Sequence, residues 1–334
     1  MSIGRPGRVF LAALSMAVLA AGVVGGASTA GARPASHLVG VDDAGPLAVT
    51  AQVYSASMDR VVPVRVQRPA DSGVRPTLYL LNGAGGGETN ATWQQNTDVV
   101  DFFADKNVNV VTPMDGAASY YTDWERDDPA LGRSKWQTFL TRELPPIIDG
   151  RFGGNGVNSI AAISMTATSV LNLAISAPGL YRAVGSYSGC AETSSPMGSA
   201  FVDLVVRSAK GADPQNMWGP RGGPGWVAND PVINAEKLRG TALYISSGSG
   251  LPGPYDNLAA PGIDGDLKDF ARQVFVGGAI EAATNLCTRN LANRLQQLNI
   301  PATFDFAPTG SHSWRYWQDD LHQSWPTLAG AMGV

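Results

Sequence analysis

The chain has 334 residues, of which 44% are hydrophobic and 16% are charged. This composition is typical of a globular protein and excludes a chain that is disordered throughout. The formal net charge is −4. Together with the lack of a long basic run, this excludes a nucleic-acid-binding protein, which needs a basic surface for the phosphates.

The first 32 residues have the pattern of a secretory signal peptide. Arg5 and Arg8 precede the apolar segment VFLAALSMAVLAAGVVGG, and an Ala-Gly-Ala triplet ends at Ala32. We therefore expect cleavage after Ala32 and an exported mature domain of residues 33–334. An uncleaved membrane anchor is the alternative, although the apolar run is short for a spanning helix.

Export affects the interpretation of the two cysteines, Cys190 and Cys287. Disulfides persist outside the cytoplasm, so we expect a Cys190–Cys287 bridge. Two buried free thiols are the alternative. Two cysteines and three histidines offer no recognisable metal-ligand spacing, so we expect no metal and no cofactor.

Strand-like and helix-like segments alternate along the mature chain, which predicts one α/β domain with a mostly parallel central sheet and helices on both faces. The predicted strands are residues 60–69, 76–84, 108–114, 158–164, 182–189, 241–250 and 301–308. The predicted helices are residues 134–148, 165–177 and 316–325. Segment 190–240 is poor in strand signals and rich in Gly, Pro and Trp, which predicts an insertion that covers part of one end of the sheet.

One serine lies at a junction between a predicted strand and a predicted helix. Ser164 has the position of the nucleophile in the sharp strand–turn–helix of α/β-hydrolases, where the residues two before and two after must be small. Ala162 and Thr166 stand there instead of glycines, and threonine is bulkier than usual. A serine that only caps the helix is the alternative.

A serine nucleophile needs a histidine as its base. His312 follows the last predicted strand, which is where this fold places its histidine. His37 lies next to the expected cleavage site, and His322 lies within the terminal helical pattern, where a surface position is expected. We therefore expect His312 to be the base.

The acid that orients the histidine must lie between the serine and the histidine in chain order. The candidates after strand 241–250 are Asp256, Asp264, Asp266, Asp269 and Glu281. The general rule for the fold favours Asp256, the earliest of them, and Asp305 lies within the last strand and looks structural. Spacing alone leaves the choice open.

Six segments in the same order resemble the antigen 85 type mycolyltransferases, most closely their branch in corynebacteria-like relatives. They are LYLLNGA, SYYTDW, KWQTFLTRELP, AISMTATS, NMWGP and GSHSWRYWQDDL. The resemblance extends from about residue 45 to residue 325. It implies an exported α/β-hydrolase with a Ser-Glu-His triad that moves mycolic acids between trehalose and cell-wall acceptors.

The resemblance selects Glu281 as the acid, because the family's glutamate lies on a helical segment about thirty residues before the histidine. Glu281 precedes His312 by 31 residues. Cys287 follows Glu281 by six residues, so a bridge to Cys190 would brace the segment that carries the acid. The resemblance also implies an oxyanion hole built from the backbone N–H groups of Ala84 and Met165.

The resemblance further implies a site for the acyl acceptor, with two departures from the family. The residues that correspond to family positions there are Asn82, Asn96, Ser313 and Trp314. Mycobacterial members carry an aspartate at the position of Asn82 and an arginine at that of Gly85. Asn82 retains hydrogen-bonding groups for a sugar hydroxyl, whereas Gly85 has no side chain to offer.

Together with the candidate triad, the resemblance implies a ping-pong acyl transfer from trehalose monomycolate, through an acyl-Ser164 intermediate, to a second trehalose monomycolate or to cell-wall arabinogalactan. Two alternatives stay open: a secreted serine esterase or lipase with water as acceptor, and a non-catalytic binding protein of the cell envelope. We expect a monomer that acts without a cofactor, with trehalose mycolates and cell-wall glycans as substrates. Peripheral contact with the outer lipid layer is compatible with this prediction.

Overall fold

The computed structural model describes residues 1, 34–69, 71 and 73–334, so the predicted signal peptide and its cleavage site lie outside the described residues. Pro34–Val334 form one compact unit. Within the described chain, no helix is both long enough and apolar enough to cross a membrane.

The described residues contain a sheet of nine strands in the order β1-β2-β3-β5-β4-β6-β7-β8-β9. The strands are β1 (His37–Asp43), β2 (Ala48–Ser55), β3 (Arg60–Gln67), β4 (Arg75–Leu81), β5 (Asn109–Pro113), β6 (Gly154–Ile163), β7 (Tyr181–Tyr187), β8 (Ala242–Ser247) and β9 (Thr303–Phe306). Strands β5, β4, β6, β7, β8 and β9 run parallel to one another, whereas β1, β2 and β3 pair antiparallel. The prediction of a mostly parallel sheet is confirmed.

The helical segments lie between the strands and after the last one. They are α1 (Trp93–Asn96), α2 (Val99–Phe102), α3 (Trp136–Thr138), the π-helical η1 (Phe139–Glu143), α4 (Leu144–Phe152), α5 (Ser164–Ser176), α6 (Pro196–Lys210), α7 (Pro214–Trp218), α8 (Pro224–Ala228), the 3₁₀ segment η2 (Ala235–Leu238), α9 (Leu267–Ala271), the π-helical η3 (Arg272–Gly277), α10 (Gly278–Gln297) and α11 (Trp314–Met332).

Alternate residues of the central strands face two different hydrophobic cores, as the pleat of a strand requires. Ile160 of β6 belongs to the core that also contains residues of α4, α5 and α10. Its neighbour Ala161 belongs to the core that contains residues of α1, α2 and α11. Helices therefore cover both faces of the sheet, and the central strands are apolar on both sides.

Two strands, β1 and β2, were not predicted from the sequence. They extend the sheet beyond β3 as an antiparallel edge. Most side chains of β1 are exposed, so its sequence lacks the buried apolar run that marks the central strands. An edge strand on the solvent side needs no such run.

The predicted helix 134–148 is divided into α3, η1 and α4. Pro145 and Pro146 occupy the first positions of α4, and a proline has no backbone N–H to continue the helical ladder. A wider π turn precedes them, which is a common way to absorb such a break.

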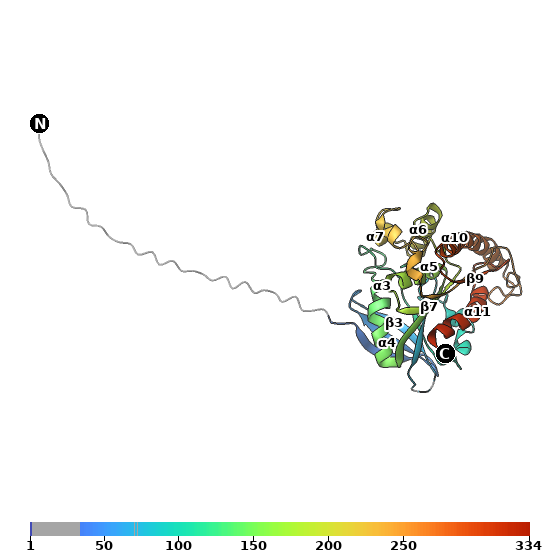
Figure 1. Cartoon of the computed structure of the whole chain (residues 1–334), viewed down its shortest axis with the longest axis horizontal. Coiled ribbons are helices and arrows are strands. Elements are labelled where there is room, and N and C mark those ends of the chain that lie inside the picture. Colours follow the sequence, from blue (N-terminus) through green and yellow to red (C-terminus); the bar gives the residue numbers. More distant parts are fainter. Residues whose placement is uncertain (2–33, 70, 72) are drawn as a thin grey trace. The chain divides into compact units, whose positions relative to one another are not determined.

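Segment 190–240 contains only helical and irregular structure, as predicted. Backbone N–H groups of Glu125 and Arg126, in the loop after β5, donate to carbonyls of α7. Asn172 of α5 donates to the carbonyl of Asn229. The segment therefore packs over loops at the carboxyl ends of the strands, beside α5, and Figure 1 shows α6 and α7 together in this region.

Candidate active site

Ser164 follows the last residue of β6 and begins α5. Its φ is +57°, in the left-handed region that non-glycine residues rarely adopt. Such strain is retained where the surrounding structure over-determines the conformation, often at functional sites. Gly83 of the neighbouring loop lies so close that a Cβ built on it would be 3.5 Å from the Cβ of Ser164.

His312 joins Ser164 to Glu281 through the two nitrogens of its ring. Nε2 lies 2.8 Å from Ser164 Oγ, and Nδ1 lies 2.7 Å from Glu281 Oε2. The backbone N–H of His312 donates to the carbonyl of Gly277, and Trp317 packs edge-on against the imidazole with ring centroids 4.8 Å apart. These contacts hold the ring between the hydroxyl and the carboxylate.

Glu281 is only 1% exposed, so its carboxylate depends on hydrogen bonds from the protein. Oε1 accepts from Ser188 Oγ at 2.7 Å, from Ser247 Oγ at 3.0 Å and from the Gly248 N–H at 2.7 Å. Oε2 is left to face His312. The structure thus brings together Ser164, His312 and Glu281 in the order that a nucleophile, base and orienting acid require.

Asp256, the acid favoured by the general rule, has a different role. Its carboxylate accepts hydrogen bonds from Gly253 N, Gln273 Nε2, Ser311 Oγ and Tyr316 OH. Burial raises the pKa of Asp256, but these four donors outweigh it and leave the pKa below its usual value. Asp256 therefore connects the loop after β8 to η3, to α11 and to Ser311, the residue before His312. None of these hydrogen bonds is to the imidazole of His312, so Asp256 does not orient the ring.

Three supporting residues were missed in the sequence: Ser188, Ser247 and Trp317. Ser188 directly follows β7, and Ser247 is the last residue of β8. Polar residues at the carboxyl ends of neighbouring parallel strands are brought to one edge of the sheet, which is a signal that could have identified both serines. Trp317 Nε1 donates to Ser188 Oγ at 3.0 Å, and nothing in the local sequence indicates that contact.

Ala84 and Met165, the predicted oxyanion donors, lie on the two backbone segments beside the serine. Met165 is the second residue of α5, so its N–H is among the unpaired donors of the helix N-terminus. The carbonyl of Ala84 accepts from the N–H of Ala118 at 2.9 Å. This hydrogen bond fixes the loop beside the Ala84 N–H. Gly86 has a φ of +62°, and a Cβ there would lie 2.2 Å from Ala117 N, so only glycine fits.

Asn82 lies buried at the start of the loop after β4. Its side chain is 0% exposed, and Oδ1 accepts from the backbone N–H of Trp93 at 3.1 Å. The indole N–H of Trp93 donates to the carbonyl of Leu81. Asn82 therefore fixes the loop from inside, and its contact with a sugar hydroxyl stays a prediction.

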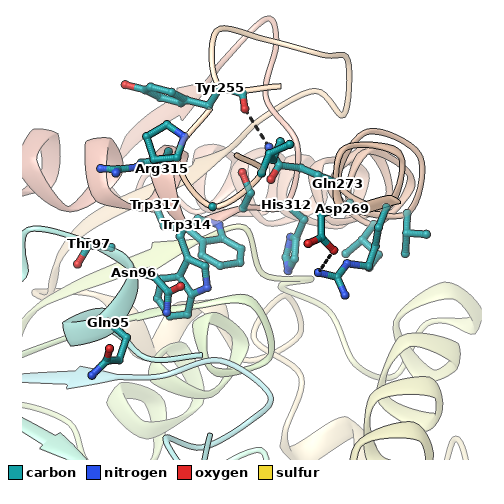
Figure 2. A pocket seen from close by; sticks show the side chains of 18 of the residues that line it. Gln95, Asn96, Thr97, Tyr255, Asp269, Gln273, His312, Trp314, Arg315 and Trp317 are labelled. Atoms are coloured by element: carbon teal, nitrogen blue, oxygen red, sulfur yellow. Dashed lines mark hydrogen bonds and ion pairs between the residues drawn. The ribbon is translucent and has the colours of Figure 1, made fainter. Parts of the chain in front are cut away.

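A cavity of about 810 Å³ opens beside His312 (Figure 2). Asn96, Ser313 and Trp314, three of the four predicted acceptor-site residues, line it. The Nδ2 of Asn96 is held by the carbonyls of Asn90 and Thr92. The volume is within the range that holds a small-molecule or sugar-sized ligand.

The rest of the cavity wall combines charged groups with apolar ones. The charged lining residues are Asp98, Asp269, Arg272 and Arg315, and the aliphatic ones are Ile263, Val276 and Ile280. Charged and amide groups suit hydroxyl-rich ligands, whereas aliphatic walls suit hydrocarbon. Among the described residues, no group of three or more His, Cys, Asp or Glu side chains is placed to hold a metal ion.

Cys190 and Cys287 form a disulfide, so the alternative of two free thiols is wrong. Cys190 lies two residues beyond Ser188, and Cys287 lies in α10 six residues beyond Glu281. The bridge therefore connects the two segments that carry the acid and one of its hydrogen-bond donors.

Comparison with known proteins places this site in a family. The family model "Esterase", described as "Putative esterase", matches residues 55–328. The diacylglycerol acyltransferase/mycolyltransferase Ag85A of Mycobacterium tuberculosis (strain H37Rv) is 32% identical over 99% of this chain and 93% of its own length. The chain belongs to the antigen 85 family. The Ag85B relative from Mycobacterium intracellulare is 31% identical over 94% of this chain and 89% of its own.

Solved structures place this antigen 85 member in the α/β-hydrolase fold. MPT51 (FbpC1) of Mycobacterium tuberculosis superposes with a TM-score of 0.69 at 24% identity, over 84% of this chain and 97% of its own. An S-formylglutathione hydrolase from Agrobacterium tumefaciens gives 0.62 at 15% identity, over 89% of this chain and 100% of its own. The predicted fold class and family are therefore confirmed.

Proposed function

We propose that this antigen 85 member is an exported acyltransferase that moves mycolic acid from trehalose monomycolate to a second trehalose monomycolate or to cell-wall arabinogalactan. The observation that carries the proposal is the unbroken contact from Ser164 through His312 to Glu281. The printed names of the relatives, diacylglycerol acyltransferase/mycolyltransferase, supply the reaction class. We propose Ser164 as nucleophile, His312 as base and Glu281 as the residue that positions the base.

In the first half-reaction, Ser164 Oγ attacks the ester carbonyl of the donor while His312 Nε2 takes the serine proton. The carbonyl oxygen becomes an oxyanion, which the N–H groups of Ala84 and Met165 stabilise. When the tetrahedral intermediate collapses, the ester C–O bond breaks and His312 gives its proton to the departing trehalose oxygen. Glu281 accepts from Nδ1 and offsets the charge of the imidazolium.

The second half-reaction uses the same groups in reverse. An acceptor hydroxyl loses its proton to His312 Nε2 and attacks the acyl-Ser164 carbonyl. Collapse breaks the bond to Ser164 Oγ, which recovers a proton from His312. The product is a new ester of the acceptor sugar, and the enzyme returns to its starting state.

We propose that the cavity beside His312 binds the sugar of donor and acceptor. Trp314 provides an apolar ring face for a pyranose, and Ser313 and Asn96 provide polar atoms. Because Gly85 has no side chain and Asn82 is buried, the charged groups for the sugar must come from elsewhere in this chain. Arg272 and Arg315 line the cavity and can supply them.

We propose that the acyl chain leaves the site over α9 and η3. Leu267, Phe275 and Val276 in these segments are 70%, 74% and 56% exposed, and Val276 also lines the cavity. Exposed apolar side chains in the segments that border a site suit a hydrocarbon ligand and contact with a lipid layer. In this proposal residues 1–32 are a signal peptide removed near Ala32, and residues 33–334 are one exported, monomeric domain.

The test is incubation of the purified mature protein with trehalose monomycolate, with and without added trehalose, and mass spectrometry of the products. Trehalose dimycolate that forms with wild type and not with Ser164→Ala supports the proposal. Free mycolic acid as the sole product would identify a hydrolase instead. No product that depends on Ser164 would refute the transfer reaction and favour the binding-protein alternative.

A further inference from the structure

Thr166, the bulky residue at the elbow, directly follows Met165 in α5, and its hydroxyl reaches the loop that carries Ala84. Its side chain is 0% exposed. Its Oγ1 lies 2.7 Å from the carbonyl oxygen of Asn82 and 2.7 Å from that of Ile163. A hydroxyl has one proton, so it donates to either carbonyl in turn or to both in a shared bond.

The Asn82 carbonyl belongs to the loop that carries Ala84, two residues further on. On the C-terminal side of the Ala84 N–H, the same loop is held by a second hydrogen bond, in which Ala118 N–H donates to the Ala84 carbonyl. The peptide that presents the Ala84 N–H has its own carbonyl, that of Gly83, bonded to Gly86 N–H, and the carbonyls on either side of it accept from Thr166 and Ala118. A displaced donor would weaken oxyanion binding, since such donors act through fixed geometry.

The Ile163 carbonyl belongs to the other segment, directly before Ser164 and Met165. The hydroxyl therefore contacts the backbone on both sides of the place where the oxyanion would form. The elbow usually needs a small residue here because another strand approaches closely. Threonine fits because its hydroxyl forms a hydrogen bond with the Asn82 carbonyl at this close approach. A methyl group at the same place would leave that carbonyl without this donor.

We propose that Thr166 is a positioning residue that sets the separation of the two oxyanion donors, Ala84 N–H and Met165 N–H, by bridging their backbone segments. The proposal rests on the proposed function, in which Ser164 is the nucleophile. It makes the threonine at this position a functional part of the site in this chain.

The test compares Thr166→Val, which keeps the shape and removes the hydroxyl, with Thr166→Ser, which keeps the hydroxyl. Hydrolysis of p-nitrophenyl butyrate is measured per active site, titrated with a fluorophosphonate. We expect Thr166→Val to lower kcat about tenfold or more with little change in KM, because one oxyanion donor is worth more than that. Thr166→Ser should stay within about threefold of wild type, since the hydroxyl is retained.

A second readout isolates the oxyanion hole from the rest of the fold. An alkyl trifluoromethyl ketone forms a tetrahedral adduct with a serine nucleophile, and its oxyanion occupies the hole. The inhibition constant of this ketone should rise in Thr166→Val by about the same factor as kcat falls. The inhibition constant of the corresponding alkyl amide, which stays trigonal, should not change.

Thr193→Val is the matched control. Thr193 is also 0% exposed, and its hydroxyl also contacts two backbone carbonyls, those of Trp226 and Asn229 in the covering segment. This variant should lose stability without the loss of kcat or of ketone affinity. If Thr166→Val does not fold, Thr166→Ala, which relieves the packing, is compared with Thr166→Ser in the same assays.

Two results would overturn the proposal: a hydroxyl-free variant with wild-type kcat and ketone affinity, or a serine variant as impaired as the valine variant. Failure of the proposed function looks different. Ser164→Ala would retain esterase activity if Ser164 were not the nucleophile, and the trehalose monomycolate assay would give free mycolic acid alone if transfer to a sugar did not occur. Neither result depends on Thr166, so the two failures are distinguished by these two measurements.

Discussion

Ser188 Oγ donates to Glu281 Oε1 at 2.7 Å, and this hydrogen bond holds the carboxylate with its other oxygen turned toward His312. Ser188 has a φ of +54°, an unusual conformation for a serine, and it in turn accepts from the indole of Trp317. The acid is thus oriented by a residue from the end of β7 and by a helix that also packs on the histidine.

Ser188→Ala should therefore impair catalysis without touching the nucleophile. A hydrogen bond to a charged group contributes about 1.5–3 kcal/mol, and Ser188 provides one of three such bonds to the buried carboxylate. We expect kcat for p-nitrophenyl butyrate to fall about tenfold with KM little changed. Ser249→Ala is the control, because the Ser249 hydroxyl lies in the loop after β8 and donates to the carbonyl of Pro308. Wild-type kcat in Ser188→Ala would show that the other two donors are sufficient.

Glu281→Gln should test the acid directly. The amide keeps the shape but no longer offsets the charge of the imidazolium, so kcat should fall about a hundredfold or more. The kcat of Asp256→Asn should fall far less, because the hydrogen bonds of Asp256 are to neighbouring loops and helices and not to the imidazole. The decisive measurement is kcat of the two variants side by side, and a larger loss in Asp256→Asn would reverse the assignment.

Asp256 should contribute to stability in a pH-dependent way. Its pKa is lowered in the folded protein, so it binds fewer protons there than in the unfolded chain. The stability is therefore present above the unfolded pKa of about 3.9 and is lost as pH falls through the lower folded pKa. Urea unfolding between about pH 6 and pH 3 should show a smaller loss of stability with acid in Asp256→Asn than in wild type. Parallel curves would contradict this role.

The disulfide should support both stability and catalysis. It closes a loop between cysteines 97 positions apart, and such bridges contribute about 2–4 kcal/mol. The double variant Cys190→Ser/Cys287→Ser should unfold at lower urea concentration, and its kcat should fall because the segments of Ser188 and Glu281 are no longer joined. Titration of unfolded exported wild type with a thiol reagent should find no free thiol. An unchanged kcat would limit the bridge to a stabilising role.

Trp314→Ala should separate acceptor binding from acylation. The indole lines the cavity beside His312, where we propose that the sugar binds, so its removal should raise KM for the trehalose acceptor about tenfold, within the range known for aromatic contacts. The rate of acylation by p-nitrophenyl butyrate, which has no sugar, should stay near wild type. An equal loss in both assays would instead indicate damage to His312 through the contact between Trp314 and Trp317.

Much of the fold could be predicted because the buried strands carry their own signal. The second halves of β4 and β6 are buried apolar runs whose residues face two cores, and no polar alternation is needed to recognise them. Edge strand β1 was missed because most of it is exposed. The break between α3 and α4 was also missed, since it depends on how two prolines are accommodated in a packed helix.

The candidate site, like the fold, could be predicted only in part from the sequence. Ser164 and His312 could be placed by their positions relative to predicted strands, and the resemblance to a family was needed to choose Glu281 over Asp256. The sequence could not show that Asn82 is buried or that Ser188 and Ser247 surround the acid. These contacts join residues up to 93 positions apart, and only packing brings them together.

The sequence by itself determined the α/β class and the family and identified Ser164 and His312 as candidates, because each depends on local patterns of burial and on short motifs. Only the tertiary structure decided which groups surround the Glu281 carboxylate and what Thr166 contacts. Both depend on the ends of parallel strands that are distant in sequence and lie side by side in the sheet. Hydrogen bonds between such segments have no local signature, since their partners are set by the pairing of strands and not by neighbouring residues.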